Sequence, residues 1–244
     1  MSTACKYING IQTFFDPAKK GLWTRRESRY QYHDDFDLYT SIPAAASRAN
    51  GNPWVKDITG AAPPTVAFGA DAQGGTLVCS LTATSEAQDA SAHWDDNRHV
   101  DLDAGAVFQA YAKLTTLPTG NGIAHLGLMS DNGTNFLGTT YNVGFTIAAS
   151  GALSCNIDDN ATPAAISTGV TLTVDTYYAF RIESFAKSAI RFYLDGARVA
   201  GSTTFAYAAT AGANSTLQPV VGVSKASGTG LGVLTVGSID IWQD

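Results

Sequence analysis

One pair of carboxylates is spaced for acid–base chemistry. Asp101 and Asp103 stand two residues apart, so on a strand both would lie on the same face. Retaining glycoside hydrolysis needs two carboxyl groups about 5–5.5 Å apart, and this is the nearest match to such a pair. The chain has only three glutamates: Glu27, Glu86 and Glu183. Because Gly105 follows the pair at once, we interpret it as a polar pair at a strand edge and expect no catalytic residue.

The densest polar cluster spans residues 89–103 and raises the question of a metal. Asp95, His99 and Asp101 could supply mixed nitrogen and oxygen ligands, and the aspartates alone could hold calcium. Their spacing matches no defined metal-binding loop. A solvated turn, in which Arg98 neutralises the aspartates, is the favoured interpretation. We therefore expect no cofactor, with calcium at these residues as the alternative.

Other catalytic patterns are missing from the sequence. No serine lies in a Gly-x-Ser-x-Gly turn, and no Gly-x-x-x-x-Gly-Lys-Ser/Thr loop could hold phosphates. The cysteines Cys5, Cys79 and Cys155 have no Cys-x-x-Cys spacing, so we expect reduced thiols that pack as small hydrophobic groups. These patterns together predict that the chain is not an enzyme.

Glycan binding is better supported by the residue types. Aromatic side chains with amide or carboxylate neighbours are typical of ligand sites that combine apolar contact with a few polar groups. The candidates for such a site are Trp94, Tyr141, Asn142, Tyr207 and Trp242. No spacing rule brings them together, so the glycan site is a hypothesis.

The elements that must position these residues are strands. Apolar and polar residues alternate through residues 108–114, and again through 179–183 and 189–194, and the last two runs predict a hairpin closed by residues 185–188. Further strands are predicted at 124–129, 143–148, 153–157, 170–174, 217–223 and 231–242. A turn-rich stretch covers 43–64, and no helical period is sustained. Short, regularly spaced strands with many glycines predict an all-β, two-sheet antiparallel sandwich.

Two of these strands resemble a known family. The runs 177–182 and 190–200, with Asp195-Gly196 at a tight turn, are similar to the paired central strands of concanavalin A-like and laminin-G-like jelly rolls. The resemblance implies a jelly-roll domain over residues 34–244. Glycosidases of this fold carry Glu-x-Asp-x-Glu along one strand, and this sequence has no such strand. Phage-encoded proteins that place such a domain behind a short N-terminal segment imply a virion protein.

Charge divides the chain into two parts. Residues 1–33 carry six basic and two acidic residues, a net charge of +4, which leaves −10 for residues 34–244 out of the total of −6. We expect residues 1–33 to form an extended basic arm that docks on an acidic protein surface, a capsid or other virion protein or a neighbouring copy in a homo-oligomer. Six basic residues are too few for a nucleic-acid binder. The expected partner-binding residues are Lys6, Lys19, Lys20, Trp23, Arg25, Arg26, Arg29 and Tyr30.

Composition excludes several classes of protein. The chain has 244 residues, of which 45% are hydrophobic and 15% charged, so it is not of the disordered class. Its apolar runs are too short for a membrane helix, and we expect no membrane partner. Residues 1–10 lack the pattern of a signal peptide, which predicts synthesis in a host cytoplasm.

The function expected from these observations is that of a non-enzymatic virion structural protein. The most specific form is a bacteriophage capsid decoration or stabilising protein anchored by its N-terminal arm. The alternatives are a carbohydrate-binding module of a phage tail or fibre, which would bind a host glycan, and an inactive glycosidase relative.

Overall fold

The computed structural model describes residues 4–8, 11–16, 21–24, 30–37, 41–44, 52–71, 74–130, 136–160, 164–207 and 215–243, and for the first three ranges the backbone alone. Within these ranges regular structure is β-strand, apart from three 3-10 turns of three residues each. No helix in the described ranges is long and apolar enough to cross a membrane.

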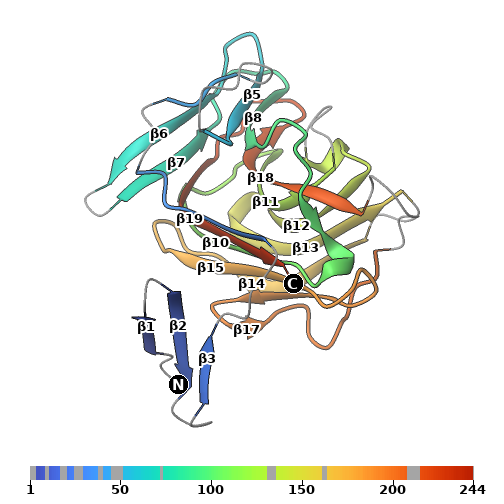
Figure 1. Ribbon diagram of the computed structural model, residues 1–244. Coiled ribbons are helices and arrows are strands. Elements are labelled where there is room, and N and C mark those ends of the chain that lie inside the picture. Colours follow the sequence, from blue (N-terminus) through green and yellow to red (C-terminus); the bar gives the residue numbers. More distant parts are fainter. Residues whose placement is uncertain are drawn as a thin grey trace.

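Two antiparallel sheets of eight strands pack face to face (Figure 1). The first, the β10 sheet, has the strand order β17 (Ala197–Arg198), β16 (Ile190–Leu194), β15 (Tyr178–Ser184), β10 (Val107–Thr116), β19 (Val233–Gln243), β7 (Gly74–Ser80) and β6 (Thr65–Asp71), with β4 (Tyr30–Asp34) also paired to β19. The second, the β11 sheet, has the order β14 (Ala164–Thr171), β13 (Ala152–Asp159), β12 (Tyr141–Ile147), β11 (Gly122–Met129), β18 (Thr216–Lys225), β8 (Gln88–His93) and β5 (Val55–Thr59), with β9 (Val100–Asp101) also paired to β18. The arrangement confirms the predicted all-β jelly-roll sandwich.

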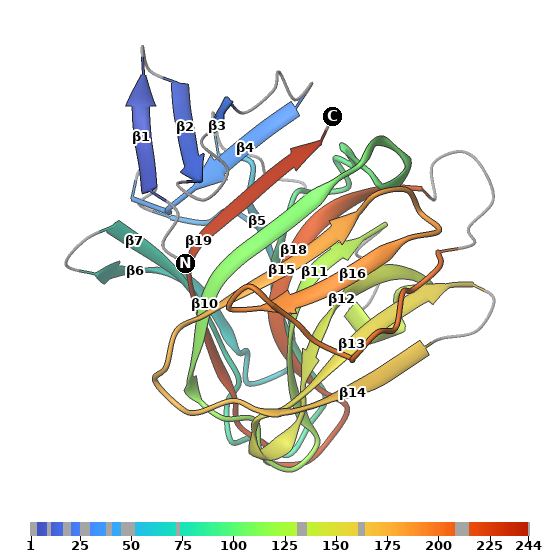
Figure 2. The same cartoon turned by 90° about the horizontal axis from the view of Figure 1, so that it is seen from below.

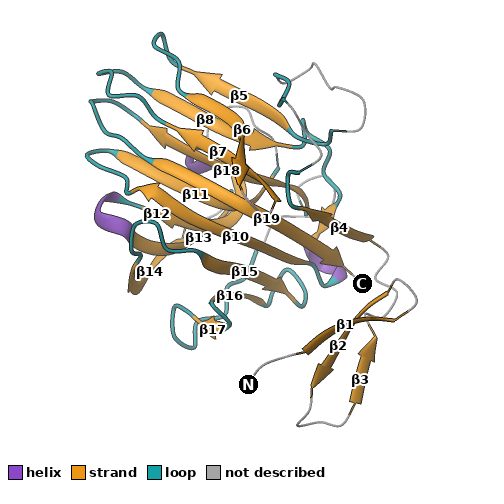
Figure 3. Cartoon of the chain, turned by 90° about the vertical axis from the view of Figure 1, so that its left-hand side faces the viewer, coloured by secondary structure: helices purple, strands orange, loops and turns teal. Residues whose placement is uncertain are grey.

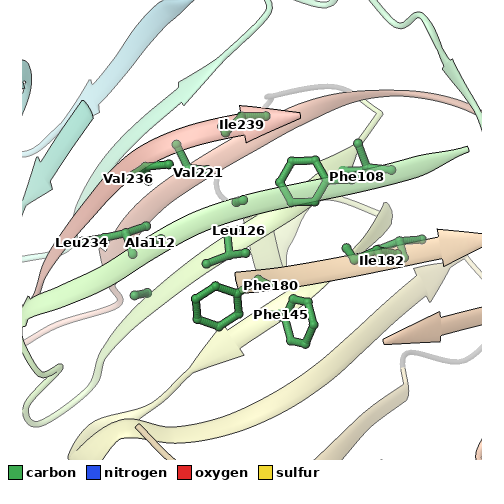
Figure 4. Packing of buried hydrophobic residues seen from close by; sticks show 14 of the residues in the cluster. Phe108, Ala112, Leu126, Phe145, Phe180, Ile182, Val221, Leu234, Val236 and Ile239 are labelled. Carbon is green, nitrogen blue, oxygen red and sulfur yellow. The ribbon is translucent and has the colours of Figure 1, made fainter. Parts of the chain in front are cut away.

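Alternation along each strand builds the core between the sheets. On β10 the buried Phe108 and Leu114 alternate with partly or fully exposed residues, as the sequence predicts. Figure 4 shows Phe145 of the β11 sheet close to Phe180 of the β10 sheet, and their ring centroids are 5.3 Å apart in an edge-to-face contact. Phe192 meets the same Phe145 ring at 5.1 Å. Each such buried side chain stabilises the fold by about 1.5–3 kcal/mol.

The predicted hairpin is present as β15 and β16. Phe180 lies opposite Leu194 and Ile182 opposite Phe192, so both pairs point into the core. The next turn is at Asp195-Gly196, where both residues have left-handed backbones, with φ of 50° and 78°. Two consecutive positive φ angles match the twist of antiparallel strands, which explains Asp-Gly at this turn.

The N-terminal segment differs from the expected extended arm. Strands β1 (Ala4–Ile8), β2 (Ile11–Asp16) and β3 (Gly21–Thr24) pair into a separate three-stranded antiparallel sheet (Figure 3). The boundary drawn after residue 33 falls inside β4, because Tyr30–Asp34 pairs with Gln243–Ile239 of β19. The sandwich therefore begins at β4.

Candidate functional site

The outer face of the β11 sheet, which points away from the core, carries many polar side chains. On β11, His125, Gly127 and Met129 face outward because their neighbours Leu126 and Leu128 belong to the core. The same alternation on the other strands brings further polar residues to this face. They are Asp57, Asp89, Ser91, His93, Asn142, Thr146, Ser154, Asn156, Asp158, Gln218 and Ser224.

Strand register aligns some of these residues in one row across the sheet. Ser91 lies opposite Asp57 on one side and Gly222 on the other. Gly222 in turn lies opposite His125, and the row continues on β12 and β13 through Thr146 and Ser154. Neighbouring strands are about 4.8 Å apart, so the row spans six strands with small or polar groups at every step.

His125 is the buried centre of this row. Its side chain is 0% exposed, and among the described residues neither ring nitrogen has a hydrogen-bond partner. Burial lowers the pKa of His125 to about 3, so the imidazole is neutral. A Cβ on Gly222 would lie 2.7 Å from Nε2 of His125 and 2.8 Å from Cβ of Ser91. Glycine at this position therefore leaves room for the edge of the imidazole against the backbone of β18.

A short turn covers the imidazole from above. The ring of Phe136, in the 3-10 turn η2 (Phe136–Gly138), stacks on His125 with centroids 5.1 Å apart and planes 8° apart. Asn142 holds this turn, because its Nδ2 donates to the carbonyls of Phe136 (3.1 Å) and Thr139 (2.7 Å). Asn156 then donates to Oδ1 of Asn142 at 2.6 Å. These bonds fix the aromatic ring over the histidine.

Asp89 is a second buried polar group on the same face. Its Oδ1 accepts a 2.9 Å hydrogen bond from the Ser91 hydroxyl, while its Oδ2 has no partner among the described residues. Burial raises the pKa of Asp89 to about 7, against the lowering effect of the Ser91 bond and with a smaller raising effect from Asp57. Buried polar atoms without partners are rare in folded proteins, and this face has them on both Asp89 and His125.

The five residues expected to bind glycan do not gather into one site. Trp94 is buried against Tyr32, with ring centroids 4.7 Å apart, and belongs to the core. Of the others, Tyr141, Asn142 and Tyr207 lie near one another, and Trp242 is on the other sheet. Tyr207 is buried, with its pKa raised by burial and by the neighbouring Tyr141, Asn142 holds the η2 turn, and Trp242 is half-buried on the β10 sheet.

The expected solvated turn at residues 89–103 is wrong for its first part. Residues 88–93 form β8, which is buried because Ala90 and Ala92 pack in the core while Asp89 and His93 face the polar row side. A tight turn follows at residues 94–97. It is held by Gln218, whose Oε1 accepts from the backbone N–H groups of Trp94 and Asp96.

The carboxylate pair and the metal candidates lie in and around a short 3-10 turn. Asp101 ends β9 and caps η1 (Leu102–Ala104), since its Oδ1 accepts from the backbone N–H of Asp103. His99 lies beside Tyr30, 6.1 Å between ring centroids, and Asp95 is in the tight turn. In the part of the chain that the structure describes, no three His, Cys, Asp or Glu side chains are grouped to hold a metal.

Most of the expected arm residues cannot be placed. Tyr30 is described, and its ring packs edge-on against Trp94 at 6.3 Å, which makes it part of the sandwich and corrects its assignment to the arm. The other seven lie outside the described side chains: Lys6, Lys19, Lys20, Trp23, Arg25, Arg26 and Arg29. Docking by the arm on a virion surface stays a prediction.

Sequence reasoning missed His125 as a site residue. Its position in the strand was the available signal. Because Leu126 and Leu128 point into the core and side chains alternate along a strand, His125 must face away from the core. What the sequence could not show was that Phe136 and Gly222 meet it from other strands and loops.

No protein-family model matches the chain, and no curated protein does. Solved structures match it in fold. A protein of unknown function from Shewanella oneidensis MR-1 has a TM-score of 0.61 at 12% identity, covering 88% of this chain and 86% of that one. A beta-1,3-glucanase from Mycobacterium marinum has a TM-score of 0.55 at 14% identity, covering 89% and 100%. A family 7 alginate lyase with bound product has a TM-score of 0.55 at 13% identity, covering 86% and 97%.

Identities this low show the fold alone, and the shared fold is the two-sheet jelly-roll sandwich. They nevertheless contradict the prediction that the chain is not an enzyme, because the glucanase and the alginate lyase are enzymes built on this sandwich. A missing Glu-x-Asp-x-Glu strand excludes one carboxylate arrangement and leaves other chemistry open. This chain therefore shares its jelly-roll fold with enzymes that act on polysaccharides.

Proposed function

We propose that this chain binds a polysaccharide across the outer face of the β11 sheet, with His125 at the centre of the site. The observation that carries the proposal is the fully buried imidazole of His125, which has no hydrogen-bond partner among the described residues. Leaving such a group unbonded costs about 1–3 kcal/mol. A ligand that bonds to the imidazole would recover that free energy.

Sugar hydroxyls suit the groups on this face. A neutral imidazole donates from one nitrogen and accepts at the other, and a hydroxyl can do both. A hydroxyl that reaches the row at Gly222 would have His125 on one side and Ser91 on the other, since Gly222 lies opposite both in the sheet. The row through Thr146 and Ser154 continues in the same direction with further hydroxyls. Because His125 is covered in the free chain, binding requires the η2 turn to shift.

Asp89 gives the same face a group that can exchange a proton near neutral pH. General acid–base catalysis is most effective when the pKa of the group is close to the working pH, and burial raises the pKa of Asp89 to about 7. The neighbouring Ser91 hydroxyl bonds to its Oδ1. The experiment therefore measures cleavage of the bound polysaccharide together with binding.

Affinity electrophoresis tests the proposal with gels containing beta-1,3-glucan, alginate or other plant, algal and bacterial polysaccharides. Retardation of the wild-type chain by at least one polymer is expected. His125→Phe keeps the stacking on Phe136 and removes both nitrogens, so it should reduce the affinity by tenfold or more. Release of new chain ends from the same polymer reports cleavage, and Asp89→Asn should abolish it.

His99→Phe is the matched control, because His99 is exposed beside Tyr30 and outside the polar row. It should bind like the wild type. Equal binding by His125→Phe and the wild type, with both folded, would remove His125 from the site. No retardation in any gel would reject the function.

A further inference from the structure

The outer face of the other sheet, the β10 sheet, has a different chemistry. Residues that alternate with the core on β10, β15, β16 and β19 face outward together, and Figure 2 shows these strands side by side. Tyr111 is 47% exposed and Phe185, at the end of β15, is 59% exposed, so the face is open. The rings of Tyr111 and Tyr177 stack in parallel, 4.6 Å apart.

Three cations of this face lie over aromatic rings. The guanidinium of Arg181 is 5.4 Å from the centre of the Trp242 ring, and that of Arg191 is 4.7 Å from the centre of Phe185. Lys113 is 5.1 Å from the centre of the Tyr177 ring. Stacking of this kind holds the planar guanidinium groups against the sheet and leaves their outer edges available.

Strand register places three arginines around one tyrosine. Tyr193 on β16 lies opposite Arg181 on β15 and opposite Arg198 on β17. Arg191, two residues before Tyr193, lies opposite Glu183 on the same face. With strands about 4.8 Å apart and alternate residues about 6.8 Å apart, the Cα atoms of the three arginines border Tyr193. Their guanidinium groups extend outward from it, to the Trp242 ring for Arg181, to Phe185 for Arg191 and to residues 202–204 for Arg198.

The arginines are incompletely neutralised. Arg181 is paired with Glu183, whereas Arg191 has no carboxylate partner in the described part of the chain. Nη2 of Arg198 donates to the carbonyls of Ser202 and Thr203 and to the Thr204 hydroxyl, which carry no charge. Nε atoms of Arg181 and Arg191 are buried without an acceptor among the described residues. On these strands Arg181, Arg191 and Arg198 outnumber the carboxylates Glu183 and Asp240 by one, while Lys113 pairs with Asp175 at 3.4 Å, on a chain whose net charge is −6.

We propose that this face binds a second ligand, an acidic polysaccharide that carries carboxylate or sulfate groups. The arginines bind its acid groups, because a guanidinium fork matches a planar or tetrahedral oxyanion in two hydrogen bonds. Tyr193 offers apolar surface to the sugar rings. Gln109, and the carboxylates of Glu183 and Asp240 beyond their pairs with Arg181 and His33, accept hydrogen bonds from sugar hydroxyls, which a nucleic-acid backbone offers far less, and this favours a glycan over a nucleic acid.

Affinity electrophoresis tests this face in four gels, which contain polygalacturonate, dextran sulfate, uncharged dextran or no polymer. Single-stranded DNA is added as a competitor in the gels with acid polymer. The wild type should be retarded by polygalacturonate or dextran sulfate and not by dextran, and the stronger of the two acid polymers identifies the acid group. Arg191→Gln should lower that affinity at least fivefold. Arg98→Gln removes the same charge outside this face and should leave the affinity unchanged.

The result also separates this face from the polar row. His125→Phe should bind the acid polymer like the wild type, so a failure of the site on the β11 sheet leaves this one standing. Equal binding by Arg191→Gln and the wild type, with the same melting temperature, would reject the proposal. Retardation by dextran as strong as by the acid polymers would show a surface for neutral glycans, and tighter binding to DNA would show a nucleic-acid surface; either would overturn it.

Discussion

The imidazole of His125 is a buried polar group that lowers the stability of the fold. His125 sits on a strand whose other face is core, and the stacked Phe136 ring excludes water from above. The charged imidazole would need water or an anion, so the neutral form persists. Residues retained in spite of such a cost are candidates for function, which is why His125 stands at the centre of the proposed site.

Replacing His125 should make the chain more stable. His125→Phe retains the ring stacking and removes two buried nitrogens that have no partner among the described residues, so the free energy of unfolding should rise by about 1–3 kcal/mol at pH 7. Urea denaturation followed by tryptophan fluorescence measures the change. His99→Phe, at an exposed position, should alter it by less than about 0.5 kcal/mol. A destabilised His125→Phe variant would mean that the nitrogens are bonded in solution.

The same residue should make the chain sensitive to acid. The pKa of His125 is about 3 in the folded chain and has a reference value of 6.5, so between these values the unfolded chain binds the extra proton. Stability therefore falls as the pH drops from about 6.5 towards 3. Unfolding midpoints measured from pH 7 to pH 4 should decline less steeply for His125→Phe than for the wild type. Parallel profiles would contradict the assignment.

Asp89 should act in the opposite direction. Its pKa is about 7 in the folded chain against a reference value of 3.8, so the folded chain holds the extra proton between these values. Its contribution is complete below pH 3.8 and is lost as the pH rises through 7. Asp89→Asn, which cannot ionise, should gain stability relative to the wild type between pH 5 and pH 8.5 in the same urea series. A constant difference across that range would show that Asp89 titrates normally.

At the scale of elements, one end of the sandwich is tied together by buried polar side chains. Lys225 ends β18 and is buried, and its Nζ donates to the carbonyls of Thr82 (2.6 Å), Thr84 (2.7 Å) and Gly230 (3.2 Å). In this way one ammonium group joins the loop after β7 to the loop between β18 and β19. The ammonium is a donor to loop carbonyls, of which that of Thr84 also accepts from the backbone N–H of Glu86 at 2.9 Å.

Removing this ammonium should loosen the end of the sandwich. Lys225→Met keeps the length of the side chain and removes the ammonium donor from the carbonyls of Thr82 and Gly230, while the Thr84 carbonyl keeps its bond from the backbone N–H of Glu86, so we expect a loss of about 2–4 kcal/mol in the free energy of unfolding. Lys187→Met is the control, because Lys187 pairs with the exposed Asp103 at 3.3 Å near the surface, and it should cost less than about 1 kcal/mol. If Lys225→Met and Lys187→Met lowered the thermal unfolding midpoint equally, the hydrogen bonds of Lys225 would not stabilise this end of the sandwich.

The elements also show what the sequence could predict. Strands with large apolar residues at every second position, such as β10, β15 and β16, were recognisable because one face is core and the other is open. Strand β8 was missed, since its core face carries only Ala90 and Ala92 and its other face carries Asp89, Ser91 and His93, a pattern that resembles a polar loop. The same holds for the candidate site. Alternation along the strand could predict that His125 faces away from the core, whereas its neighbours on other strands depend on the strand register.

At the scale of the whole molecule, charge and polarity divide between the two outer faces. The β11 sheet presents mostly uncharged polar groups around His125, and the β10 sheet presents arginines and aromatic rings around Tyr193. Neither division is visible in the net charge of −6. Strand register produces this difference between the faces, because it decides which charged residues on adjacent strands become neighbours.

The N-terminal boundary of the sandwich is set by β4, and truncation should show it. Asp34 is buried and accepts hydrogen bonds from the Tyr32 hydroxyl (2.5 Å), the Trp54 indole (2.9 Å) and the backbone N–H of Phe36 (2.8 Å). A chain starting at residue 30 keeps these bonds and the pairing with β19, so its unfolding midpoint should match that of the full chain. A chain starting at residue 38 leaves the Trp54 indole without its acceptors and uncovers Trp94, so it should lose at least about 1–3 kcal/mol. If removing residues 1–29 alone destabilised the chain as much, the three-stranded sheet would be part of the folding unit, and the sandwich would begin before β4.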